Sequence, residues 1–172
     1  MTELIRLYSQ IAILRRGPQD VPASVLLLMA TVVGYFAVNF VVNAVLPPVG
    51  GPWLVRLVLD VAFTLVWYWL VLKLLRRPER ILQTTTAVFG FQAVLSPVLA
   101  LSEWFALRYQ HDALWQVPFS LIALVMLIWL IAANTHVMKA ALEWSSAASV
   151  ALVILQFLIE NLVVLSISPG KP

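Results

Sequence analysis

Five long apolar runs, each close to the thickness of a lipid bilayer, constrain this chain more than any motif that it carries. A bilayer core of roughly 30 Å requires about 20 apolar residues in a helical span. The runs cover residues 23–46, 53–75, 81–101, 117–138 and 147–167. Because lipid offers no hydrogen-bond partners, each run must pair its own backbone groups as a helix. The sequence therefore predicts an all-α, polytopic membrane protein with residues 1–172 in a single membrane domain.

Composition supports the same class and argues against others. Of the 172 residues, 62% are hydrophobic and 11% are charged, whereas a typical soluble domain is about 25% charged. So little polar surface cannot cover a water-soluble globule, which argues against a soluble enzyme and against a nucleic-acid partner. The chain has no cysteine, and no nucleotide, hydrolase or zinc motif occurs. We therefore expect no enzymatic activity, no metal and no cofactor.

Lysine and arginine are distributed unevenly between the two ends of the predicted bundle. Short loops force neighbouring spans to run antiparallel, so each loop can be assigned to one end. Eight basic residues fall at the end that holds the N-terminus: Arg6, Arg15, Arg16, Lys73, Arg76, Arg77, Arg80 and Lys139. Three fall at the other end: Arg56, Arg108 and Lys171. The positive-inside rule then predicts a cytoplasmic N-terminus and a C-terminus outside.

The first sixteen residues differ from the spans because they are amphipathic. Apolar side chains recur at helical spacing from Leu4 to Leu14, while charged side chains such as Glu3 and Arg6 share the opposite face. This pattern is typical of a helix that lies on the membrane surface. We expect residues 1–16 to form a short interfacial helix on the cytoplasmic leaflet that anchors the start of the first span.

Seven polar side chains fall at a similar depth in the outer half of the predicted spans. They are Asn39, Asn43, Arg56, Asp60, Ser96, Glu160 and Asn161. An ionisable side chain at mid-membrane costs about 2.5–3.5 kcal/mol, so each requires a partner or a purpose. Arg56 is one helical turn from Asp60 and can pair with it, which leaves Glu160 as a second carboxylate. We expect these seven side chains to converge, and we call them the polar cluster.

Two interpretations of the polar cluster stay open. Two acids and one base suit proton-coupled transport or an exchangeable cation. Alternatively, the polar contacts only hold the helices in register, each contributing about 0.6 kcal/mol on average. The two interpretations differ in one observable feature, which is whether the charged groups enclose a water-accessible cavity or a dry, closed contact.

The third span and the turn before it carry the sequence RILQTTTAVFGFQAVLSP at residues 80–97. The basic turn, the polar pair Gln83-Thr84, Gly90 and Pro97, together with five spans and an amphipathic start, resemble the Yip1 family. The resemblance implies a membrane-organising or protein-interaction factor, here a bacterial relative in the inner membrane. The long polar cytoplasmic region of the eukaryotic members is absent from this sequence, so small-GTPase binding has no support.

Two functional hypotheses follow from the sequence. The first is a non-enzymatic protein that contacts the lipid bilayer and binds other membrane proteins or itself. Its cytoplasmic contacts would be the amphipathic helix and a basic turn made of Arg76, Arg77 and Arg80. The second is a small transporter or channel subunit in which Arg56, Asp60 and Glu160 line the path. Many carriers pair two related halves, so five spans without a visible repeat count against a standalone transporter.

Overall fold

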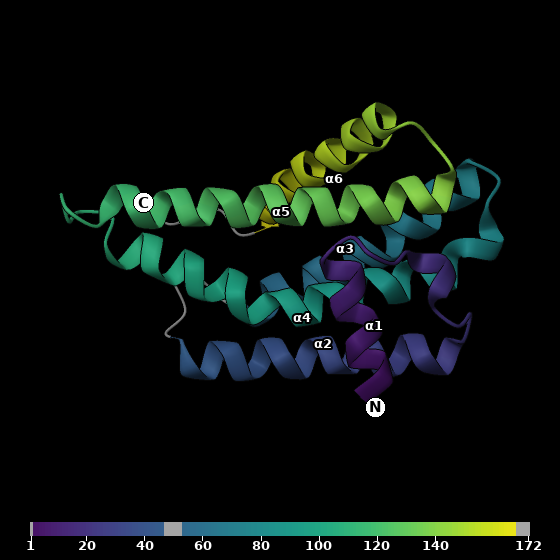
Figure 1. Ribbon diagram of the computed structural model, residues 1–172, viewed down its shortest axis with the longest axis horizontal. Helices are drawn as coiled ribbons and strands as arrows, with labels where there is room; N and C mark the ends of the chain where they lie inside the picture. Colours follow the sequence, from purple (N-terminus) through teal and green to yellow (C-terminus); the bar gives the residue numbers. More distant parts are fainter. Residues whose placement is uncertain (1, 47–52, 168–172) are drawn as a thin grey trace.

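The computed structural model describes residues 2–46 and 53–167. Within these ranges every regular element is a helix (Figure 1). The elements are α1 (Thr2–Ala12), η1 (Pro18–Asp20), α2 (Val25–Val45), α3 (Trp53–Leu74), η2 (Pro78–Arg80), α4 (Ile81–Arg108), α5 (Gln116–Leu142) and α6 (Ser146–Ile167). Helices α2 to α6 are each long and apolar enough to cross a membrane, which confirms the five predicted apolar helices.

The helix boundaries match the apolar runs at some ends and exceed them at others. Helices α2 and α3 begin and end within two residues of the predicted runs. The run for the third span predicts an end at Leu101, but α4 continues to Arg108. Helix α5 also continues past Met138 and ends where Glu143 adopts a left-handed conformation with φ of 59°. A change in hydropathy marks the end of the apolar run, whereas backbone hydrogen bonding decides where the helix ends.

Consecutive long helices run antiparallel, so the bundle has two chemically different ends (Figure 1). The turns at residues 75–80 and 143–145 lie at one end, together with the start of α2. We call it the basic end, because it carries Lys73, Arg76, Arg77, Arg80 and Lys139. Residues 109–115 connect α4 to α5 at the opposite end.

Helix α4 occupies the centre of the bundle. Helices α1, α2, α3 and α5 all contact it (Figure 1). Residues 84–91 of α4, in the half near the basic end, are buried without interruption. Apolar side chains from α1, α3, α5 and α6 enclose this stretch, among them Ile11, Tyr68, Leu72, Val137, Met138 and Val153. The larger apolar core therefore lies in the half of the bundle near the basic end.

Helix α1 lies across α4 and forms part of this core (Figure 1). Its Tyr8 ring packs on Gly90, so closely that a Cβ at that glycine would lie 2.3 Å from the ring. The Tyr8 hydroxyl hydrogen-bonds the Thr31 hydroxyl of α2 at 2.8 Å. Trp129 Nε1 of α5 donates to the Ala12 carbonyl at 2.9 Å. Helix α1 therefore joins three long helices, which is more than the predicted anchoring of the first span.

Candidate functional site

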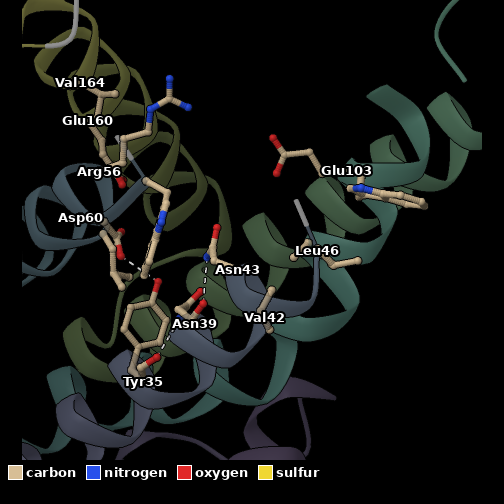
Figure 2. Close-up of a pocket in the computed structure, with 14 residues that line it drawn as sticks. Tyr35, Asn39, Val42, Asn43, Leu46, Arg56, Asp60, Glu103, Glu160 and Val164 are labelled. Atoms are coloured by element: carbon tan, nitrogen blue, oxygen red, sulfur yellow. Dashed lines mark hydrogen bonds between the residues drawn. The ribbon is translucent and has the colours of Figure 1, made fainter. Parts of the chain in front are cut away.

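A polar cleft opens between α2, α3, α4 and α6 at the end of the bundle opposite the basic end (Figure 2). Its volume is about 370 Å³. The polar side chains that line it are Tyr35, Asn39, Asn43, Arg56, Asp60, Glu103 and Glu160. We call this cleft the vestibule and its end of the molecule the vestibule end. A cleft of this size lined by so many polar groups has room for several water molecules.

A second, smaller cavity of about 110 Å³ lies farther from the vestibule end. Its polar lining consists of Tyr35, Asp60, Gln92, Ser96, Asn134, Gln156 and Glu160. Three of these residues, Tyr35, Asp60 and Glu160, also line the vestibule. We call the second space the inner cavity. The three shared side chains form the boundary between an open cleft and a buried space.

Asp60 of α3 and Glu160 of α6 meet at this boundary (Figure 2). Their carboxyl groups are within hydrogen-bonding reach of each other. Tyr35 of α2 donates its hydroxyl to Asp60 Oδ2 at 2.8 Å. A carboxyl group can donate a hydrogen bond to another only when it carries a proton. This pair is therefore arranged either to share one proton or to bind a cation.

Two asparagines extend the polar face of α2 toward the mouth of the vestibule. Asn39 Nδ2 donates to the Tyr35 carbonyl at 2.9 Å, and Asn43 Nδ2 donates to the Asn39 carbonyl at 2.8 Å (Figure 2). The four-residue spacing places all three residues on one helix face. Each amide nitrogen thus donates to a backbone carbonyl of its own helix. The side-chain oxygens of Asn39 and Asn43 remain able to accept hydrogen bonds in the vestibule.

Arg56 does not pair with Asp60, so that part of the sequence prediction is wrong. Figure 2 shows the Arg56 guanidinium pointing away from Asp60, and the side chain is exposed. Both ion pairs found among the described residues lie at the basic end. Tyr35 is the hydrogen-bond donor to Asp60 instead. Arg56 lies in the first turn of α3, where a long basic side chain can extend toward the polar end of the helix.

The polar cluster is brought together only in part. Asn39, Asn43, Arg56, Asp60 and Glu160 line the vestibule. Ser96 lines the inner cavity, where it is 8% exposed. Asn161 is exposed, and its Nδ2 donates to the Phe157 carbonyl at 2.8 Å. Adjacent helical residues differ in direction by about 100°, so Asn161 cannot face the same cleft as Glu160.

Several residues that line the two cavities are not among the seven predicted for the polar cluster. Tyr35 could have been found, because it continues the four-residue spacing of Asn39 and Asn43. Glu103 could not, because it lies beyond the predicted end of the third span and reaches the vestibule only through the extension of α4. Gln92, Asn134 and Gln156 of the inner cavity were not assigned to the polar cluster, although Gln92 and Gln156 precede Ser96 and Glu160 by four residues, which places each pair on one helix face.

At the basic end, two of the three arginines predicted to make cytoplasmic contacts form ion pairs with another residue of the chain. Arg77 and Arg80 form ion pairs with Glu143, at N–O distances of 2.8 and 2.5 Å. Arg80 also donates to the Ala140 carbonyl at 2.8 Å. The hydrogen bond from Arg77 and the charges of both arginines lower the pKa of Glu143. These contacts join the α3–α4 and α5–α6 turns, while Arg76 stays exposed.

Comparison with known proteins gives no further guide to the site, because no family model, no curated protein and no solved structure matches this chain. The resemblance to the Yip1 family stays a prediction. Within residues 2–46 and 53–167, no group of three or more His, Asp or Glu side chains is placed to hold a metal ion. The features of the molecule that bear on its function are therefore the vestibule, the inner cavity and the carboxyl pair between them.

Proposed function

We propose that this protein is a non-enzymatic integral membrane protein that admits a small solute through the vestibule, as a small transporter or channel subunit. The observation that carries the proposal is the Asp60–Glu160 pair, which lies where an open cleft meets a buried cavity. A polar network that only held helices in register would be expected to close into a dry contact. Here the carboxyl pair borders a cleft of about 370 Å³, which favours transport over a purely structural role.

We assign the vestibule to the outer side of a bacterial inner membrane, with the N-terminus in the cytoplasm. The excess of lysine and arginine at the basic end supports this orientation; Lys171, which was counted at the other end, lies outside the described residues. The 21 residues of α2 extend about 31 Å, which matches the bilayer core. Thr31, which binds Tyr8, lies roughly 9 Å along α2 from its start. That depth suits an interfacial helix for α1.

A role in protein interaction or membrane organisation is the second candidate. It is favoured by the outward side of α1, where Ile5 and Arg6 are exposed. Two arginines of the basic turn are held by Glu143, so Arg76 is what remains of the predicted basic contact. Partner proteins or self-association would then involve α1 more than the turn. We rank this candidate below transport because its support is the exposure of two side chains, whereas the vestibule is a defined polar cleft.

The proposal is tested by water access, for which the chain is well suited because it has no native cysteine. Single substitutions Asn43→Cys and Ala100→Cys place a thiol in the vestibule. The matched control Val98→Cys lies at a similar depth on α4, with Val98 51% exposed outside both cavities. A thiol reacts as its thiolate, which forms in water. A charged, membrane-impermeant thiol reagent should label the vestibule positions on the order of tenfold faster than the control.

Flux of protons and of monovalent cations into liposomes that contain the purified protein gives the second part of the test. Flux should fall by about tenfold or more in Asp60→Asn and Glu160→Gln, because each removes an ionisable group from the path. Asn161→Ala, on the outward side of α6, should leave the flux unchanged. Equal labelling of vestibule and control positions, with no flux above empty liposomes, would reject transport and return the carboxyl pair to a structural role.

A further inference from the structure

The polar side chains that line the inner cavity are either acidic or neutral. Its lining contains two carboxyl groups, those of Asp60 and Glu160, and several neutral oxygen-bearing side chains. Of the described residues that line it, none is lysine, arginine or histidine. Arg56, the nearest basic residue of the predicted cluster, lines the vestibule and points away from Asp60 (Figure 2). A carboxyl pair in a buried space without a basic neighbour must hold a proton, bind a cation, or do both.

Two amide oxygens in the same lining have no hydrogen-bond donor. Gln92 Oε1 and Gln156 Oε1 are both buried without a partner among the described residues. Gln156 is only 3% exposed, so bulk solvent does not reach it. A buried acceptor without a donor costs about 1–3 kcal/mol. These oxygens therefore favour a ligand in the cavity that is a cation or a hydrogen-bond donor.

A chain of hydrogen bonds lies beside Gln156, on the side away from the vestibule. Tyr68 donates to Asn134 Oδ1 at 3.3 Å, and Asn134 Nδ2 donates to the Leu130 carbonyl at 3.0 Å. Because the Tyr68 hydroxyl and the Asn134 amide donate along this chain, neither donates to Gln156 Oε1, which lacks a partner among the described residues.

We propose that the inner cavity binds a small monovalent cation, for which sodium is the probe. The carboxyl groups of Asp60 and Glu160 supply the charge, and the side-chain oxygens of Gln92 and Gln156 complete the ligand set. The inference rests on the proposed function, because the ion reaches this cavity through the vestibule. It goes beyond that function by naming the ligand class and the residues that bind it.

Volume and charge both favour a monovalent ion. A cavity of about 110 Å³ holds an ion with few of its waters, since one water takes roughly 30 Å³ in the liquid. Magnesium gives up its water reluctantly, and calcium takes about six to eight oxygen ligands with several carboxylates among them. Among the described residues, no third acidic side chain joins this pair in a group that could hold a metal ion, and Glu103 lines the vestibule but not the inner cavity. With one proton shared between them, the two carboxyl groups carry one negative charge, which a single monovalent cation balances.

The experiment measures equilibrium binding of radioactive sodium to the full chain in lipid nanodiscs, with N-methylglucamine chloride keeping the ionic strength constant. The proposal expects saturable binding and a thermal unfolding midpoint that rises with sodium. Glu160→Gln and Gln156→Leu should each weaken sodium binding by about tenfold or more. Gln156→Leu also removes the unpartnered oxygen, so the variant is expected to fold. The matched control is Asn161→Leu on the same helix, which should change the affinity by no more than about twofold.

Each outcome separates this site from the proposed function. Saturable sodium binding that is lost in the two cavity variants and kept in the control supports the site. Absent binding, with an unfolding midpoint that sodium does not move, would overturn it, since water alone would then satisfy the glutamine oxygens. Tighter binding of calcium than of sodium would overturn the monovalent assignment. Sodium binding without flux would keep the site and reject transport, whereas vestibule-dependent flux without sodium binding would reject the site and keep transport.

Discussion

The half of the bundle near the basic end and the half near the vestibule end are built from the same long helices but packed in opposite ways. Near the basic end, side chains such as Leu72, Phe91 and Val137 are fully buried in one continuous core. A second, smaller apolar cluster of Tyr35, Leu57, Val61 and Phe89 extends from the middle of the bundle toward the vestibule end. The remaining space there is occupied by the vestibule and the inner cavity.

Charged groups follow the same division. At the basic end, arginines from one turn bind Glu143 in the next, in contact with solvent. At the vestibule end, the carboxyl groups of Asp60 and Glu160 lie together without an arginine partner. Closely packed apolar regions carry most of a fold's stability, whereas regions with few buried contacts open more easily. The comparison indicates that α1 and the core near the basic end stabilise the bundle. The vestibule end can therefore contain polar cavities and a carboxyl pair without the bundle coming apart.

The largest effect is expected from a mutation that creates a cavity in the core near the basic end. Phe91→Ala should lower the free energy of unfolding by about 3–5 kcal/mol, because the lost ring contacts leave a void that the neighbours fill only in part. Phe40→Ala is the matched control, since Phe40 is 61% exposed on α2, and it should cost no more than about 1 kcal/mol. Thermal unfolding of both variants in the same detergent gives the difference. Equal losses would break the comparison.

A smaller effect is expected where α1 crosses α4. Gly90→Ala places a methyl group 2.3 Å from the Tyr8 ring, and overpacking of this kind costs about 1–3 kcal/mol. Gly34→Ala is the matched control, because nothing lies within 4 Å of a Cβ there, and alanine should stabilise that helix by roughly 0.5–1 kcal/mol. Proteolysis of the N-terminal segment reports whether α1 has been displaced. Opposite signs for the two glycines would sharpen the comparison, whereas a neutral Gly90→Ala would remove α1 from the core.

The sequence predicted the spans better than it predicted the contacts between them. Apolar length is a property of one segment, so α2 and α3 could be located within two residues. Helix α4 exceeds its run because Ser102 and Glu103 end the apolar stretch without ending the helix. The fold class and the number of long helices could therefore be predicted, but the reach of α4 into the vestibule end could not.

The candidate site was predicted less completely, because it depends on contacts between different helices. Four-residue spacing on one helix correctly placed Asn39 and Asn43 on a single face. The same spacing on α3 suggested that Arg56 pairs with Asp60, but spacing does not fix the direction in which a long arginine side chain extends. The donor that Asp60 receives is Tyr35 from another helix. Contacts between helices depend on rotation and packing, which no single segment encodes.

The smallest expected effect concerns the ion pairs of the basic end. Glu143→Gln removes both contacts that join the two turns. Exposed ion pairs contribute little because solvent screens them, so the unfolding midpoint should fall only slightly. Glu79→Gln is the matched control, since Glu79 is exposed in the adjacent turn and forms no ion pair within the described part of the chain.

The pH dependence of this last effect identifies its origin. The arginines lower the pKa of Glu143 in the folded protein, so its contribution to stability is present above the pKa of the unfolded carboxyl group. The contribution is lost as the pH falls through the lower, folded pKa. The midpoint difference between the native chain and Glu143→Gln should therefore be seen at about pH 7 and shrink as the pH falls below the ordinary glutamate pKa. A difference at neutral pH as large as that of Phe91→Ala would mean that the turns, and not the apolar core, hold the basic end closed.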